Sequence, residues 1–168
     1  YDCGVTDAAD NARSLNALAS HIADFKDMVV PYFSGTGILF HHNTVGRLKL
    51  WMMDGASKLS ATTIANSMNL KWDVVGTSDF DGDGNTDILF QNSGSGKLRL
   101  WLMDDASKLS ATTIANSMNL RWDVVATSDF DGDGNSDILL RDTLTGKLKL
   151  WLMDGASKLS ATTIANSM

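Results

Sequence analysis

Apolar and polar residues follow short, β-like patterns between residues 72 and 115, and these patterns predict four strands. The run from Trp72 to Thr77 is short and apolar, and the run from Asp87 to Gln91 is almost continuously apolar. A continuous apolar run is typical of a strand that is buried on both faces. From Lys97 to Met103, leucine occupies every second position, so the leucines and their neighbours point to opposite faces. The run from Leu109 to Ala115 is rich in Ser and Thr, which suits an outer, solvent-exposed strand.

The pattern is repeated along the chain. Residues 47–96 and 97–146 align without a gap, and a further copy starts at Lys147 and runs to Met168. Four short strands in each repeat of 40–50 residues are typical of one propeller blade. We therefore predict an all-β fold of propeller-blade repeats over residues 28–168, with about three four-stranded blades. Their predicted ranges are 28–68 (a degenerate first blade), 69–118 and 119–168.

Residues 1–27 have a different pattern, which predicts a short N-terminal α-helix. Apolar residues recur there at helical spacing from about Asp7 to Phe25. Thr6 can cap the helix, with aspartates near its positive end. This amphipathic helix either covers the open face of the first blade or docks onto the next subunit.

An acidic nonapeptide lies between the first two predicted strands of the second and third blades, at residues 79–87 and 129–137. Carboxylates occupy its positions 1, 3, 5 and 9, and glycine occupies position 6. Such carboxylates repel one another unless they surround a hard cation, and Ca²⁺ prefers oxygen ligands. Gly84 and Gly134 permit the sharp bend that turns these oxygens inward. The two loops therefore predict two calcium sites.

The nonapeptide is not an EF-hand loop. Position 12 is Phe90 in one copy and Leu140 in the other, where an EF-hand needs a bidentate glutamate. The flanking segments are predicted strands, not helices. A plain hairpin turn would need only one Asp-Gly or Asn-Gly pair. We therefore expect a calcium-binding connection between two strands.

These residues resemble the FG-GAP/VCBS-type repeats of integrin-like β-propellers. The resemblance rests on the nonapeptide, the Trp-Asp-Val-Val before it and the Leu-x-Leu-Trp-Leu-Met-Asp after it, and it extends from about Val29 to Met168. It implies that each calcium loop joins the first two strands of a blade. It also implies a ligand set for each loop, in which the asparagine acts through its backbone carbonyl: Asp79, Asp81, Asp83, Asn85 and Asp87, and Asp129, Asp131, Asp133, Asn135 and Asp137.

The chain departs from that family pattern in two ways. Residues 29–40 contain a shortened loop without carboxylates, so we expect no calcium in the first blade. About three blades are also fewer than the four to eight of closed propellers. An open arc would leave apolar faces at both ends, and such faces recruit neighbours. We therefore expect self-association, capped ends, or a piece of a longer chain.

Composition agrees with a loop-rich, cation-binding β protein. All 20 acidic residues of the 168-residue chain are Asp, and the formal net charge is −6. Asp favours turns and cation loops over helices. Two bound calcium ions would bring the formal charge to about −2. No basic patch suggests nucleic acid, and no apolar run is long enough to span a membrane.

The remaining candidate residues have structural interpretations. His41 and His42 point to opposite faces of a strand, so they do not chelate one metal together, and we expect exposed strand-end residues. The five tryptophans recur with the repeat and are expected to pack the blades, with sugar stacking as a minority interpretation. Cys3 is expected to be a free thiol, with an intermolecular disulfide as the alternative. There is no glutamate, nucleophile elbow or Cys–His pair, so we predict that the chain is not an enzyme.

Together these patterns predict an extracellular or cell-surface structural or adhesion protein. It would bind about two Ca²⁺ and self-associate through its blades into a ring or a fibre. The extracellular placement follows from the calcium supply there, to which extracellular calcium modules are tuned. The alternatives are a lectin-like or protein-binding propeller module and, less favoured, an accessory domain of an enzyme.

Overall fold

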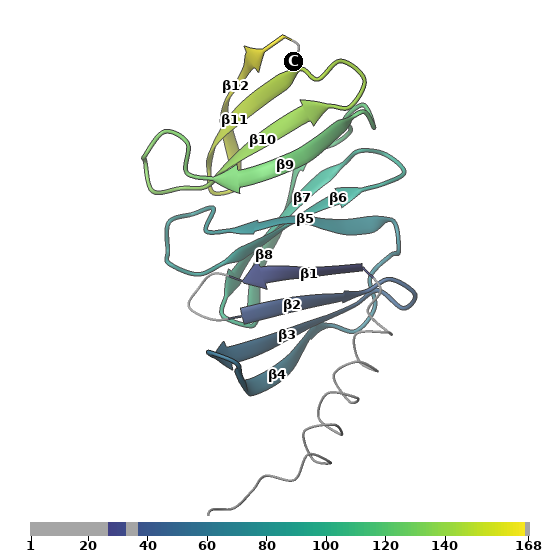
Figure 1. Ribbon diagram of the computed structural model, residues 1–168, viewed down its shortest axis with the longest axis vertical. Coiled ribbons are helices and arrows are strands. Elements are labelled where there is room, and N and C mark those ends of the chain that lie inside the picture. Colours follow the sequence, from purple (N-terminus) through teal and green to yellow (C-terminus); the bar gives the residue numbers. More distant parts are fainter. Residues whose placement is uncertain (1–26, 33–36, 167–168) are drawn as a thin grey trace, which may run out of the picture.

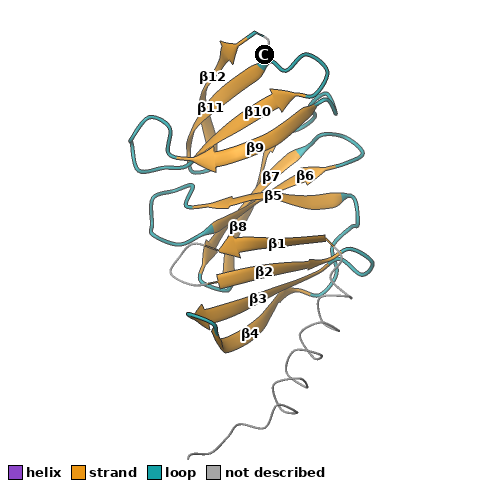
Figure 2. Cartoon of the chain, viewed as in Figure 1, coloured by secondary structure: helices purple, strands orange, loops and turns teal. Residues whose placement is uncertain are grey.

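The computed structural model describes residues 27–32 and 37–166, and all the regular structure in this part is β (Figures 1 and 2). No helix that could cross a membrane occurs in these ranges. The helix predicted from Asp7 to Phe25 lies outside the described residues, as does Cys3. The strands are β1 (Asp27–Tyr32), β2 (Gly37–His42), β3 (Arg47–Asp54), β4 (Ser57–Ala65), β5 (Trp72–Ser78), β6 (Asp87–Asn92), β7 (Leu98–Asp104), β8 (Ser107–Ala115), β9 (Trp122–Ser128), β10 (Asp137–Asp142), β11 (Leu148–Asp154) and β12 (Ser157–Ala165).

The strands form three antiparallel sheets, each made of four strands that are consecutive in the sequence. We call them the first (β1–β4), second (β5–β8) and third (β9–β12) sheets. They are stacked along the long axis of the molecule (Figure 1). The first strands of neighbouring sheets lie against one another, β1 with β5 and β5 with β9. The last strand of each sheet, β4, β8 or β12, is mostly exposed.

The four strands predicted between residues 72 and 115 are confirmed as β5 to β8, with ends that differ by two residues at most. The apolar residues of β6 are buried, as expected for a strand covered on both faces. The Ser- and Thr-rich strand β8 is largely exposed, as predicted. The all-β part of the predicted fold class is therefore confirmed.

Two apolar clusters fill the spaces between the sheets, and the alternation along β7 connects them. Trp101 and Met103 pack with residues of the first sheet, including Leu48 and Leu50. Leu98 and Leu100 pack instead with residues of the third sheet, including Ile138 and Met153. The predicted alternation is thus confirmed, and the second sheet is packed on both faces.

The tryptophans that recur on β3, β7 and β11 are part of this packing. Trp51, Trp101 and Trp151 are buried, and so is Trp72 at the start of β5. A lysine of the next strand lies over each of the first three rings, at 4.1 to 4.7 Å from the ring centroid. The packing role is confirmed for these four residues, and the sugar-stacking interpretation stays an untested alternative. Trp122 is half-buried.

The expectation that both histidines are exposed was wrong for His41. His41 and His42 do lie at the end of β2, as predicted. However, His41 is buried, whereas His42 is half-buried and its Nδ1 lies 3.1 Å from the Thr44 hydroxyl. Whether a strand end is exposed depends on what packs over it, and the local pattern does not contain that information.

Candidate metal centre

The nonapeptides form the connections between β5 and β6 and between β9 and β10, which lie on the same edge of the stack (Figure 1). The first aspartate organises each loop. In the second sheet, the two carboxylate oxygens of Asp79 accept hydrogen bonds from the backbone N–H groups of Gly82 (2.8 Å) and Gly84 (2.9 Å). Gly84 has φ +88°, a conformation that side chains rarely adopt. The predicted sharp bend is therefore confirmed.

The corresponding loop of the third sheet has the same geometry. The carboxylate of Asp129 accepts hydrogen bonds from the N–H groups of Gly132 (2.6 Å) and Gly134 (3.0 Å), and Gly134 has φ +95°. The chain therefore encodes the same loop twice.

The last aspartate of each nonapeptide ties the loop to the sheet. Asp87 is buried at the start of β6, and its two oxygens accept from the N–H groups of Phe80 (2.8 Å) and Met103 (2.9 Å). Asp137 makes the corresponding bonds in the third sheet. Each of these carboxylates thus joins the loop, the second strand and the third strand of its sheet.

Three carboxylates of each loop converge. Asp79, Asp81 and Asp87 each offer an oxygen, and these oxygens all lie within 4.8 Å of one another. Asp129, Asp131 and Asp137 form the equivalent group in the third sheet. Three carboxylates at this separation make a compact acidic cage, which is the donor set that Ca²⁺ prefers.

The local environment fits a bound cation. Asp81 Oδ1 is buried and has no hydrogen-bond partner among the described residues, although a buried carboxylate oxygen is costly without one. It belongs to a residue whose neighbours in the cage, Asp79 and Asp87, are also acidic. A cation coordinated by these carboxylates would satisfy this oxygen and offset their repulsion.

The pKa values in the cage of Asp79, Asp81 and Asp87 show the same cost of burying carboxylates together. Burial raises the pKa of Asp87 to about 7, although hydrogen bonds from Met103 and Phe80 oppose the shift and nearby acidic charges add to it. Burial, with the charge of Asp83 as the next cause that raises it, also increases the pKa of Asp81. Without a cation, this cage therefore resists full ionisation at neutral pH. In the more open loop, backbone hydrogen bonds from Gly132 and Gly134 lower the pKa of Asp129.

The structure does not bring every predicted ligand into these groups. The carboxylate of Asp83 accepts from the backbone N–H of Asn85 at 2.7 Å and from its side-chain amide at 3.1 Å. Asp133 accepts from the backbone N–H of Asn135 at 2.7 Å. The roles of these four residues as calcium ligands stay predictions.

The two loops differ in what lies next to them. The backbone carbonyls of Asp79 and Phe80 accept hydrogen bonds from the third sheet, from the N–H groups of Ser136 (2.8 Å) and Gly155 (2.9 Å). The Phe80 side chain is fully buried in the cluster between the second and third sheets. We call this set of contacts the loop clamp. Sequence reasoning missed Phe80, although its position between two predicted calcium ligands was a signal that it is held in place.

A comparison with protein-family models supports the resemblance seen in the sequence. Residues 79–140 match the model of the FG-GAP-like repeat. The match starts at the first aspartate of one loop, includes the whole second loop and ends within β10. This stretch of the chain therefore carries an FG-GAP-type repeat, as the sequence predicts. No curated protein and no solved structure matches the chain.

Proposed function

We propose that this chain is a calcium-stabilised structural or adhesion module that works outside the cell or at its surface. In this proposal each acidic loop holds one Ca²⁺ and stiffens the connection between the first two strands of a propeller-type blade. The observation that carries the proposal is the pair of three-aspartate cages, one of which contains the unpartnered buried oxygen of Asp81. Extracellular calcium is abundant enough to fill sites of moderate affinity.

Self-association is the second part of the proposal. Three sheets are fewer than the four or more blades of closed propellers. On the third sheet, Val125 and Phe130 are 48% and 45% exposed, although both are large apolar residues. Exposed apolar faces of this kind mark interaction sites. The expected product is a ring if the contact closes and a fibre if it does not.

The proposed function is tested by the oligomeric state and melting temperature of the protein in calcium and in EGTA. At about 100 times Kd, each calcium site should add about 2.7 kcal/mol of stability. We expect calcium-dependent rings or fibres in negative-stain images and a higher melting temperature for the wild type. Asp81→Ala combined with Asp131→Ala should abolish both effects. Equal melting of the wild type in calcium and in EGTA would refute the calcium assignment.

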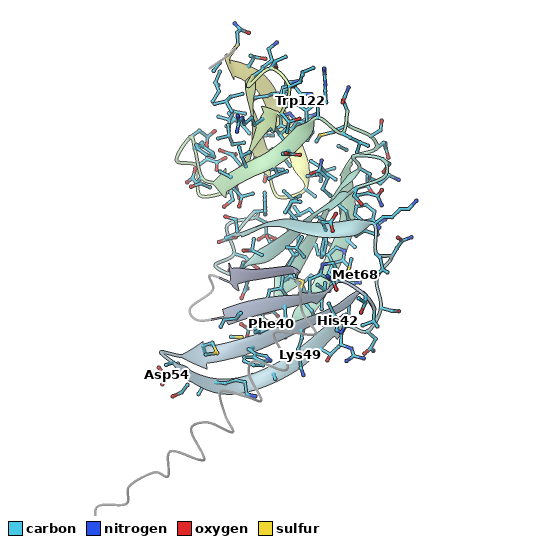
Figure 3. The ribbon with its side chains drawn as sticks, turned by 45° about the vertical axis from the view of Figure 1, so that its right-hand side comes forward. Phe40, His42, Lys49, Asp54, Met68 and Trp122 are labelled. Carbon is cyan, nitrogen blue, oxygen red and sulfur yellow. The ribbon has the colours of Figure 1, made fainter. Side chains whose placement is uncertain are left out.

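A ligand-binding module is the second candidate, and one observation favours it. Trp122 is the half-buried tryptophan, on β9 of the third sheet (Figure 3). It lines a cavity of about 200 Å³ with Met118, Asn119, Lys149 and Trp151, among others. Binding of a glycan or peptide that is lost in Trp122→Ala, with an unchanged melting temperature, would favour this candidate. We assign no catalytic reaction to the chain.

A further inference from the structure

The third sheet lacks an aromatic pair that the first and second sheets contain. In the first sheet, the ring centroids of Phe40 and Trp51 are 4.6 Å apart, with an angle of 53° between the ring planes. In the second sheet, those of Phe90 and Trp101 are 4.8 Å apart, at 56°. Tilted pairs at this separation are favourable. At the position equivalent to Phe90, 50 residues further on, the third sheet has Leu140.

A cavity of about 200 Å³ lies where this phenyl ring is missing. Six residues line it: Met118, Asn119, Trp122, Leu140, Lys149 and Trp151. Leu140 and Trp151 also belong to the cluster between the second and third sheets. Their equivalents, Phe90 and Trp101, belong to the cluster between the first and second sheets, where the Phe90 ring is fully buried. The shorter side chain of Leu140 leaves the corresponding space open.

The cavity reaches the surface, so a ligand can enter it. Asn119 is exposed, and Met118 and Trp122 are half-buried. Trp72, the equivalent of Trp122 in the second sheet, is only 9% exposed. An engineered apolar cavity of about 150 Å³ binds benzene. The space beside Trp122, at about 200 Å³, is therefore large enough for one aromatic ring.

The charges at the cavity favour a negative group on that ring. Lys149 lies opposite Leu140 on β11, and its Nζ is 4.6 Å from the centroid of the Trp122 ring. No carboxylate of the described residues forms an ion pair with Lys149. Asp142, which pairs with Trp122 across β9 and β10, is instead 3.4 Å from the guanidinium of Arg121. The ammonium group of Lys149 therefore attracts an anion to the cavity.

We propose that this cavity binds one aromatic ring that carries a carboxylate. A small aromatic acid and the C-terminal phenylalanine of a peptide both supply this chemistry. The ring takes the place of the missing phenyl group beside Trp151, and the carboxylate lies near Lys149. The inference rests on the second candidate function, ligand binding beside Trp122, and it names the chemical class of the ligand. It requires neither calcium binding nor self-association.

Saturation-transfer NMR with phenylacetate as the probe tests the proposal on the full chain. The wild type should bind phenylacetate with a dissociation constant of about 10⁻³ M, which is usual for a ligand of about ten non-hydrogen atoms. Leu140→Phe restores the ring that the other sheets have and should fill the cavity. Leu139→Phe is the matched control, because it adds the same ring at the next position of β10, on the opposite face.

We expect Leu140→Phe to weaken phenylacetate binding at least about tenfold and to raise the melting temperature. Leu139→Phe should bind the probe like the wild type. Two further probes need no variant: phenethylamine has the opposite charge, and cyclohexylacetate lacks the aromatic ring. Each should bind the wild type about threefold more weakly than phenylacetate. Tighter binding of the peptide Gly-Gly-Phe than of phenylacetate would assign the site to peptide ends, and the reverse order would assign it to small acids.

Two results would overturn this inference: no binding of phenylacetate to the wild type up to about 10 mM, or equal binding by the wild type and Leu140→Phe. Screening of glycans and peptides with Trp122→Ala then separates the inference from the function on which it rests. If Trp122→Ala abolishes binding of another ligand, only the ligand class is wrong. If Trp122→Ala changes the binding of none of them, the ligand-binding candidate function fails as well.

Discussion

The fold imposes a large electrostatic cost on Asp87. It is buried, it accepts two backbone hydrogen bonds, and its carboxylate faces those of Asp79 and Asp81. Burial is the main reason that its pKa rises to about 7. The native fold thus retains a carboxylate that resists ionisation, which is reasonable where a cation supplies the missing positive charge.

The raised pKa of Asp87 predicts the pH dependence of the calcium-free protein. The unfolded pKa of Asp is about 3.9. Since the folded pKa is higher, protonated Asp87 contributes stability that is complete below pH 4 and lost as the pH rises through 7. The melting temperature in EGTA should therefore fall between pH 5 and pH 8, and calcium should reduce this fall.

Asp87→Asn is the variant that isolates this effect, because it removes the titrating group from the cage. Its melting temperature in EGTA should depend less on pH over the same range, whatever its absolute value. The lowered pKa of Asp129 acts at more acidic pH and does not contribute in this window. An unchanged slope in Asp87→Asn would show that another group is responsible.

At the scale of strands and loops, the close approach of β5 and β9 depends on a glycine. A Cβ on Gly76 would lie 2.8 Å from Cγ2 of Thr127, closer than real Cβ atoms approach. The third repeat has Ala126 at the equivalent position of β9. The first strands of the two sheets can therefore pack directly only because the second repeat has no side chain there.

Gly76→Ala should lower the free energy of unfolding by about 1–3 kcal/mol, the usual cost of overpacking. Its φ is not positive, so the backbone itself accepts alanine. Thr127→Ser, which removes the clashing methyl group, should restore part of the loss in the double variant, as measured by urea denaturation. If the effects of the two substitutions on the free energy of unfolding are additive, the contact between β5 and β9 is not the cause of the loss in Gly76→Ala.

The strands and the acidic loops were predictable because their signals are local. Two-residue alternation determines which side chains of β7 share a face, and glycine at position 6 determines the bend of the loop. The sequence does not show which neighbouring sheet each face contacts. For this reason the burial of His41 could not be predicted from it. The ligand role of Asp83, which the resemblance implies, stays a prediction; in the structure its carboxylate accepts a hydrogen bond from the backbone N–H of Asn85.

At the scale of the whole molecule, three similar repeats occupy three different environments. The second sheet is packed on both faces, and its acidic loop is held by Ser136 and Gly155 of the third sheet. The loop of the third sheet has no such clamp among the described residues. Phe80 is fully buried, whereas Phe130 is 45% exposed. Near-identical sequences could not predict this difference in burial, because it depends on the position of each sheet in the stack.

The different environments predict unequal consequences for two equivalent substitutions. Asp81→Ala should lower the melting temperature in calcium more than Asp131→Ala, because the loop of Asp81 also clamps the second sheet to the third. Asp131→Ala should instead weaken assembly more strongly. Differential scanning calorimetry at a protein concentration too low for assembly separates the two effects. Equal losses of stability would mean that the clamp does not depend on the bound ion.

The central claim is that the two acidic loops bind calcium. Isothermal titration calorimetry tests this claim most directly. The wild type, freed of metal, should bind two Ca²⁺ per chain, with dissociation constants of about 10⁻⁴ to 10⁻³ M. Asp81→Ala and Asp131→Ala should each reduce the stoichiometry to one, and the double variant should show no saturable binding. If the wild type shows no saturable binding up to about 10 mM calcium, the acidic loops are not calcium sites and the proposed function is wrong.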